Sequence, residues 1–168
     1  MPLTLQGQAS PPDTPPSSHV SLYFDTVDGT LKTKDSSGTI VAISHPAPLS
    51  ANSTSSHSTT STTYVSINSM SLVLNPGVWN INFHTSIQVN STSTELAYVS
   101  LFDGESQITH SEKQFHNMSA HPHAVTYPVS THTIITVSSG TKTITARFKS
   151  GSGTSITSFA RIISAVAE

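Results

Sequence analysis

The fold class of this chain is decided by the stretch Asn75-Pro76-Gly77-Val78-Trp79-Asn80-Ile81-Asn82-Phe83-His84. It opens with Asn-Pro-Gly, a turn signal, because proline fixes φ and glycine tolerates positive φ. Apolar and polar residues then alternate, so that Trp79, Ile81 and Phe83 share one face of an extended strand. The pattern predicts a strand over 78–89, bent or bulged along its length, with one face in a core.

Further strand-like runs lie on both sides of this one. They occupy residues 64–67, 69–74, 96–102, 107–109, 125–129, 133–137, 143–149 and 158–166. Turn signals separate them, among them Asp103-Gly104, Ser139-Gly140 and Gly151-Ser152-Gly153, and no amphipathic helix of useful length is visible. About eight strands at this spacing predict an all-β fold, an antiparallel jelly-roll sandwich that forms a head over residues 63–168.

The chain before residue 63 is organised differently. Residues 1–18 contain Pro11-Pro12 and Pro15-Pro16 and are expected to form an extended arm that cannot fold alone, because proline lacks an amide donor. Residues 19–43 predict a small β-hairpin or three-stranded meander with turns at Asp28-Gly29 and at 35–38. Residues 44–62 are rich in Ser, Thr and Pro and predict a linker.

Composition excludes several classes of function. The chain has 168 residues and a formal net charge of −2, which argues against electrostatic binding of nucleic acid or of an anionic membrane. No apolar run is long enough to span a bilayer, and residues 1–6 lack the pattern of a signal peptide. Without cysteine the chain has no disulfides and no thiolate chemistry. These features predict synthesis in a cytoplasm.

The surface is expected to be polar but poorly charged. Only 10% of the residues are charged, whereas the usual share in globular proteins is about 25%. Ser and Thr at outward strand positions cost less to bury against a neighbouring chain than Lys or Glu would. The composition is therefore typical of a plain Thr-rich sandwich or of a component of an assembly.

No catalytic constellation stands out in the sequence. The Gly-x-Ser-x-Gly pattern of a nucleophile elbow is missing, and Gly151-Ser152-Gly153 is interpreted as a loop. Nothing marks a pair of carboxylates for glycoside hydrolysis. We therefore expect a protein that is not an enzyme and that needs no cofactor.

Four histidines form the one open chemical question: His110, His116, His121 and His123. His121-Pro122-His123 alternates like ligands on one strand face, which makes His121 and His123 candidate metal ligands. Converging imidazoles bind zinc, iron or nickel, for example around the axis of a trimer. The simpler interpretation is a set of solvent-exposed loop residues, and a pH-dependent contact is a third.

Several motifs of the head occur in the same order in a known family. They are the stretch 75–83, Ala97–Phe102 with Asp103-Gly104, Ile134–Val137 with Ser139-Gly140, Thr143–Phe148, and the ending 158–165. In this order they resemble the jelly rolls of the complement globular-head and tumour-necrosis-factor family. The resemblance covers residues 63–168, although segment 114–127 matches nothing in that family. It implies a homotrimer built around a three-fold axis by one sheet edge and its aromatic residues.

A second resemblance concerns the N-terminal part. Its motifs are Val20-Ser21-Leu22-Tyr23-Phe24-Asp25, Asp28-Gly29-Thr30-Leu31 and Lys34-Asp35-Ser36-Ser37-Gly38. They resemble a short segment common in tail, fibre and head-decoration proteins of tailed phages, where it often follows a Pro-rich lead. Combined with a trimer-forming jelly roll, the segment implies a viral structural protein that docks on the virion through its N-terminal part.

We therefore expect a trimeric capsid decoration (cement) or head-fibre protein of the virion, bound to major capsid or other virion proteins. The expected docking residues are Pro11, Pro12, Pro15, Pro16, Leu22, Tyr23, Phe24 and Leu31. Those expected in the head core or the trimer interface are Trp79, Phe83, Tyr98 and Phe102. The alternative is a receptor-binding tail fibre or adhesin tip whose loops, such as 108–127, recognise a host surface glycan.

Overall fold

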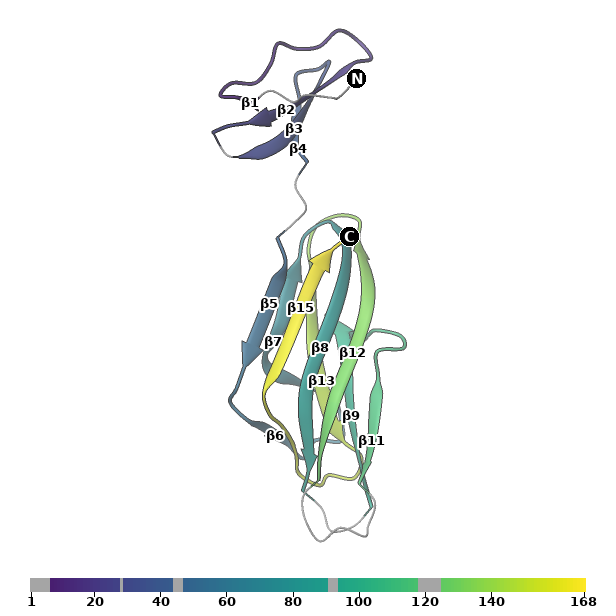
Figure 1. The fold of residues 1–168 in the computed structure, drawn as a ribbon. Coiled ribbons are helices and arrows are strands. Elements are labelled where there is room, and N and C mark those ends of the chain that lie inside the picture. Colours follow the sequence, from purple (N-terminus) through teal and green to yellow (C-terminus); the bar gives the residue numbers. More distant parts are fainter. Residues whose placement is uncertain (1–6, 28, 44–46, 91–93, 118–124) are drawn as a thin grey trace, which may run out of the picture. The chain divides into compact units, whose positions relative to one another are not determined.

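The computed structural model describes residues 7–27, 29–43, 47–90, 94–117 and 125–168, and it divides into two compact units, Met1–Pro46 and Ala47–Glu168 (Figure 1). Every regular element in these ranges is a β-strand. No helix in the described part of the chain is long and apolar enough to cross a membrane. The predicted all-β class is therefore confirmed.

The N-terminal unit is a four-stranded sheet. In order across the sheet, its strands are β1 (Gly7–Gln8), β2 (Val20–Asp25), β3 (Thr30–Asp35) and β4 (Ile40–Ala42). Strands β2 to β4 form the expected antiparallel meander, with Phe24 opposite Leu31. The carboxylate of Asp35 closes the second turn, because it accepts hydrogen bonds from the amides of Ser37 and Thr39, both at 2.9 Å.

The Pro-rich arm does not stay apart from this sheet. Strand β1 pairs in parallel with β2, and the amide of Thr26 donates a hydrogen bond to the carbonyl of Gln8 at 2.9 Å. The Nζ atom of Lys34 donates to the carbonyl of Pro12 at 2.8 Å. Residues 7–19, which the sequence predicts to belong to an extended arm, thus fold back on their own meander. The physical reason is that the free edge of β2 and Lys34 satisfy backbone groups that a Pro-rich segment cannot pair internally.

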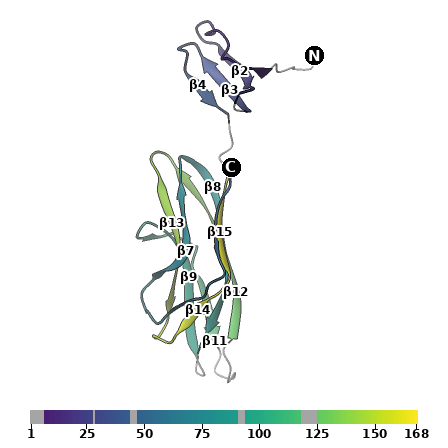
Figure 2. The same ribbon diagram turned by 90° about the vertical axis from the view of Figure 1, so that its left-hand side faces the viewer.

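The head is a sandwich of two antiparallel sheets, which Figure 2 shows edge-on. The first sheet contains β5 (Leu49–Ser53), β6 (His57–Thr59), β8 (Gly77–Val89), β12 (Val125–Val137), β14 (Ile156–Ser158) and β15 (Arg161–Ala167). The second contains β7 (Val65–Leu74), β9 (Glu95–Asp103), β10 (Ser106–Gln107), β11 (Lys113–Asn117) and β13 (Lys142–Ser150).

The order of the strands identifies a jelly roll. Strands β14 and β15 lie end to end along the same edge of β8, since Ser158 lies opposite Ile87 and Ile162 opposite His84. On their other edge, β14 pairs with β6 and β15 pairs with β5. The first sheet therefore has the order β5/β6, β15/β14, β8, β12, and the second has β7, β13, β9, β11. Most connections cross from one sheet to the other, so the predicted antiparallel jelly-roll sandwich is confirmed.

Part of the predicted linker belongs to the head. Within 44–62, β5 pairs with β15, with Leu49 opposite Ala165, and β6 pairs with β14, with His57 opposite Ser158. Leu49 also packs against the core. The linker prediction is corrected for these strands. Composition alone does not reveal these two strands, because small polar residues are as common on the outward face of an edge strand as in a linker.

The core lies between the two sheets. Strand β8 carries the side chains that its alternation predicts, and Trp79 and Phe83 are 1% and 0% exposed. The indole nitrogen of Trp79 donates to the carbonyl of Asn75 at 2.9 Å, so the Asn-Pro-Gly turn fixes the position of this ring. Fully buried side chains of the second sheet face β8, namely Ala97, Val99, Leu101, Ile144, Ala146 and Phe148.

Candidate functional site

The N-terminal unit exposes an apolar sheet face, which we term the open face. Alternation along β2 brings three apolar side chains to it, and the pairs Phe24–Leu31 and Thr33–Val41 extend it across β3 and β4. Exposed fractions reach 41% for Leu22, 39% for Phe24 and 56% for Val41. The open face consists of Val20, Leu22, Phe24, Leu31, Val41 and Ile43.

The opposite face of the same sheet is covered by the arm. Tyr23 is only 2% exposed there, and Asp25 beside it pairs with Lys32 at 2.8 Å. Lys34 lies on this face and binds the carbonyl of Pro12, so the arm passes over the Tyr23 side. Of the four predicted docking prolines, Pro12 is half-buried here, as is Pro15, while Pro11 and Pro16 are exposed.

The open face resembles one side of a hydrophobic core without a second layer packed against it. Among the described residues of the N-terminal unit, Tyr23 is the only apolar side chain in the buried class. A unit of about 40 residues with so little buried apolar area is marginal by itself. Leu22, Phe24 and Leu31 thus lie where a partner can reach them. Tyr23, another of the expected docking residues, is buried in the unit and lies on the opposite face.

Charged residues of the head concentrate on one of its two sheets. Residues 47–168 contain ten Asp, Glu, Lys and Arg. Eight of them lie on or next to β9, β11 and β13 of the second sheet: Glu95, Asp103, Glu105, Glu112, Lys113, Lys142, Arg147 and Lys149. The other two are Arg161, which is buried, and Glu168 at the end of the chain.

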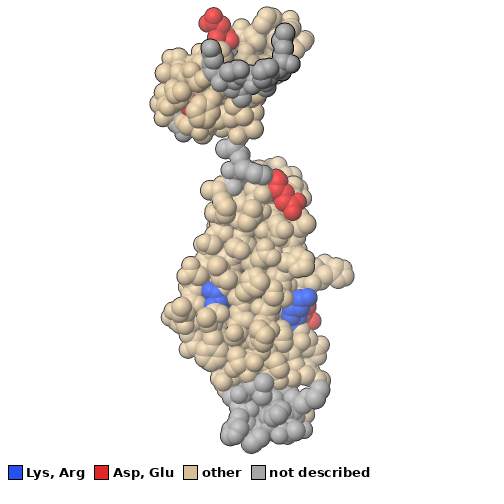
Figure 3. Space-filling view, viewed as in Figure 1, with Lys and Arg blue, Asp and Glu red and all other residues tan. Residues whose placement is uncertain are grey.

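The outward face of the first sheet is therefore almost free of charge (Figure 3). At one end of β8 it also carries exposed apolar side chains, with Val78 36%, Ile134 57% and Val166 48% exposed. Ile134 and Val166 lie opposite the same residue, Asn80, from its two neighbouring strands. We refer to Val78, Ile134 and Val166 as the head patch. Such a face is far less costly to bury against another protein than a charged one.

Aromatic rings and cations alternate on the outer side of the second sheet. The guanidinium of Arg147 lies 4.5 Å from the ring centre of Phe102, and that ring is 5.0 Å from the ring of Tyr64. The Nζ atom of Lys149 lies 4.6 Å from the ring of Tyr64 and 4.7 Å from that of Tyr98. Tyr98 and Phe102, expected in the core or the trimer interface, therefore belong to this cation–aromatic row.

The row ends in a short hydrogen bond whose removal has a measurable effect. The hydroxyl of Tyr64 donates to Glu112 at 2.6 Å, and this bond is the main reason why the pKa of Glu112 lies below its usual value. Tyr64→Phe should therefore raise the pKa of Glu112 toward 4.5, as measured by NMR titration of its carboxyl carbon. Tyr98→Phe is the matched control and should leave that pKa unchanged. Equal shifts in both variants would contradict the assignment.

Glu95 is a buried acid at the start of β9, with 4% of its surface exposed. Its carboxylate accepts hydrogen bonds from the hydroxyl of Ser152 and, at 3.0 Å, from the amide of that residue. Burial by itself would raise the pKa of Glu95, but these bonds to the ionised form outweigh it and hold the pKa below 4.5.

Acid should weaken the head through Glu95. Because its folded-state pKa is depressed, ionised Glu95 stabilises the fold above about pH 4.5, and this contribution is lost as the pH falls through the folded pKa. Glu95→Gln should lower the free energy of unfolding at pH 7 by about 1.5–3 kcal/mol, the range for a hydrogen bond to a charged group. In urea unfolding, the difference from wild type should shrink at pH 3. An equal difference at both pH values would contradict the role of the charge, and Glu168→Gln serves as the exposed control.

The predicted metal ligands, His121 and His123, lie outside the described residues. His110 and His116 are exposed. Within the described ranges, no three His, Asp or Glu side chains form a group that could hold a metal ion.

Comparisons with known proteins found no matching family model and no similar curated protein. Among solved structures, the chain is similar to VP2 of infectious bursal disease virus in a subviral particle, with a TM-score of 0.46 and 7% identity over 77% of this chain and 35% of the VP2 chain. The structure of the Gx strain of that virus gives a TM-score of 0.46 and 9% identity over the same shares. The chain thus spans about a third of the VP2 chain.

Proposed function

We propose that the chain is a structural protein of a tailed-phage virion, a homotrimeric capsid decoration or head-fibre protein that is anchored through its N-terminal unit. The observation that carries the proposal is the open face, where Leu31 is half-buried and five other apolar side chains are exposed. Among the described residues of this unit, Tyr23 is the one apolar side chain that is buried. The occupant that we assign to it is an apolar surface of a capsid protein. Packing there would complete the missing half of the core of the N-terminal unit.

Two further features support attachment by this unit. In the described residues, β4 pairs on one side only, so its other edge is available for strand addition, in which backbone hydrogen bonds supply affinity. In a trimer, three N-terminal units would bind one particle together. Even weak single contacts then yield stable attachment through the high effective concentration of the second and third units.

The head patch supports the trimer. One of its residues, Ile134, belongs to β12, a strand of 13 residues without Asp, Glu, Lys or Arg that pairs with β8 and with no other described strand. An uncharged edge beside exposed Val78, Ile134 and Val166 suits contact with a second copy of the head. The cation–aromatic row on the other sheet would then remain in solvent.

The experiment has two parts. Light scattering during size-exclusion chromatography should give the mass of three chains of 17.8 kDa each. The full chain is then mixed with particles of the virus that encodes it, made without this gene, and sedimented. We expect the chain to sediment with the particles. A chain that stays in the supernatant would overturn the attachment, and a monomeric mass would overturn the trimer.

The second candidate function is recognition of a host surface glycan by the head. The observation that favours it is a hollow on the outward face of the first sheet, whose lining includes hydroxyl and amide groups. Binding of the isolated full chain to host cells, with loss of binding after enzymatic removal of surface glycans, would support this role. Absence of binding to cells would exclude it.

A further inference from the structure

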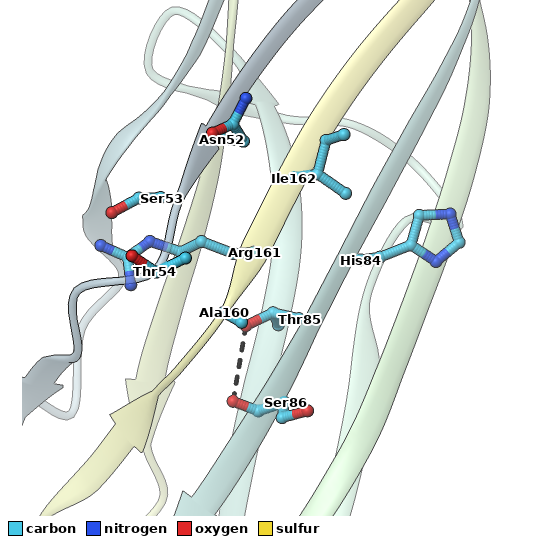
Figure 4. A pocket seen from close by; sticks show the side chains of 9 residues that line it. All are labelled: Asn52, Ser53, Thr54, His84, Thr85, Ser86, Ala160, Arg161 and Ile162. Carbon is cyan, nitrogen blue, oxygen red and sulfur yellow. Dashed lines mark hydrogen bonds between the residues drawn. The ribbon is translucent and has the colours of Figure 1, made fainter.

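A break in the strand register opens a hollow in the first sheet. Between the pairs Ser158–Ile87 and Ile162–His84, the chain from β14 to β15 has one residue more than β8. The amide of Phe159 still donates to the carbonyl of Ser86, so the extra residue lies between Phe159 and Ile162. The strands next to β14 and β15 are also interrupted at this point, since β5 ends at Ser53 and β6 begins at His57. The result is a hollow of about 360 Å³ that opens on the outward face (Figure 4).

Most of the residues that line the hollow carry an uncharged hydrogen-bonding group, although much of the lining surface is apolar. Asn52 and Thr54 line it from the β5 side and Ser86 from β8, while Ala160 and Ile162 supply small apolar surfaces. Its volume is at the lower end of the range of about 300–1,000 Å³ that is typical of ligand pockets. That is room for one small ring with polar substituents.

One cation lines this hollow. Arg161 is only 5% exposed, and its side chain extends from β15 toward β5 (Figure 4). Its Nε atom donates to the carbonyl of Asn68 at 3.3 Å, and Nη1 donates to the carbonyls of Ser55, Ser158 and Phe159. No carboxylate of the described residues forms an ion pair with it, and no described acceptor binds Nη2.

This arrangement leaves a positive charge without its counter-ion. Carbonyl dipoles hold the guanidinium in place, yet a buried charge that lacks an opposite charge is costly. The cost is visible in the pKa of Arg161, which burial lowers from its usual value. An anion that enters the hollow would supply the missing charge and an acceptor for Nη2. Arginine suits this role because its planar donors match a carboxylate.

We propose that the hollow binds a carboxylate-bearing sugar. The carboxylate pairs with Arg161, and the sugar hydroxyls bind Asn52, Thr54 and Ser86. The uncharged walls favour a ligand with many hydroxyls over a bare inorganic anion, and Ile162 provides an apolar contact for a ring face. This site is independent of the N-terminal attachment, so a failure of either proposal leaves the other standing.

The test is saturation-transfer NMR on the full chain with methyl glycosides of N-acetylneuraminic acid and glucuronic acid, and with methyl glucoside as the neutral probe. We expect the acidic sugars to bind at least about tenfold more tightly than the neutral one, as for a hydrogen bond to a charged group. Equal binding of acidic and neutral sugars, or no binding at millimolar concentration, would overturn the proposal.

Three variants locate the site. Arg161→Gln removes the charge and should abolish the preference for acidic sugars. Because that variant risks misfolding, Ala160→Trp provides a second test, since Ala160 is exposed and a large ring there fills the hollow without entering the core. It should eliminate sugar binding. Val73→Trp, at a 57% exposed position of the opposite sheet, is the control and should bind like wild type. Unchanged binding by Ala160→Trp would place the sugar elsewhere and overturn the assignment.

Discussion

Replacing Leu22 and Phe24 together by serine should eliminate attachment to particles while both units stay folded. Both side chains lie on the open face, 41% and 39% exposed, so their loss removes contacts to a partner rather than buried contacts within the unit. Apolar residues at the centre of an interface contribute about 2 kcal/mol or more each when truncated. The double variant should therefore bind roughly a thousandfold more weakly per N-terminal unit. Co-sedimentation with particles made without the gene measures the loss.

The matched control uses another exposed apolar residue of the same unit. Val27 is 76% exposed but lies in the turn after β2, outside the open face. Val27→Ser should sediment with particles like wild type. NMR chemical shifts of residues 7–43 verify that the unit is intact in both variants. If the double variant still binds, attachment does not use the open face, and the proposal in its present form fails.

The second large effect concerns stability of the head. Phe83→Ala should lower the free energy of unfolding by about 3–5 kcal/mol, the usual cost of truncating a fully buried aromatic ring. Phe83 is 0% exposed and lies in β8 between Ile163 of β15 and Thr131 of β12, so no neighbour can close the cavity without moving a central strand. Since the chain contains no cysteine, no disulfide offsets the loss. Thermal and urea unfolding measure it.

Val73→Ala provides the comparison, because Val73 is 57% exposed on β7 of the second sheet, away from the head patch. Surface substitutions of this kind usually change stability by less than about 0.5 kcal/mol. Urea unfolding should therefore separate the two variants clearly. Similar losses in both, or a loss below about 1 kcal/mol for Phe83→Ala, would mean that the core around β8 is loosely packed.

Local patterns were sufficient for the elements and for the class of fold. Alternation at Trp79, Ile81 and Phe83 predicts both the strand and its buried face, because side chains of a strand point to opposite sides in turn. The Asp-Gly turn at 28–29 predicts the meander in the same local way. Patterns failed for β5 and β6, since a strand at the sheet edge with small polar residues has no local signature that separates it from a linker.

For the candidate sites, too, local patterns predict some features and miss others. Strand β2 has apolar residues on both faces, with Leu22 and Phe24 on one and Tyr23 on the other, so alternation alone cannot tell which face is covered. The arm decides it, because Lys34 on the Tyr23 side donates a hydrogen bond to the carbonyl of Pro12 in the arm. Tyr98 and Phe102 were equally ambiguous, since whether an aromatic ring lies in a core or beside a cation depends on strands distant in sequence.

The sequence by itself determined the all-β class and most strands of the head, since these follow from periodicity and turn chemistry within a few residues. Only the tertiary structure decided that the arm folds back, that charge gathers on one sheet, and that Arg161 lines a hollow without a carboxylate partner in the described part of the chain. These features depend on pairing between β-strands far apart in the chain. A register shift of one residue between β8 and β15 is invisible in either strand alone, yet it creates the hollow.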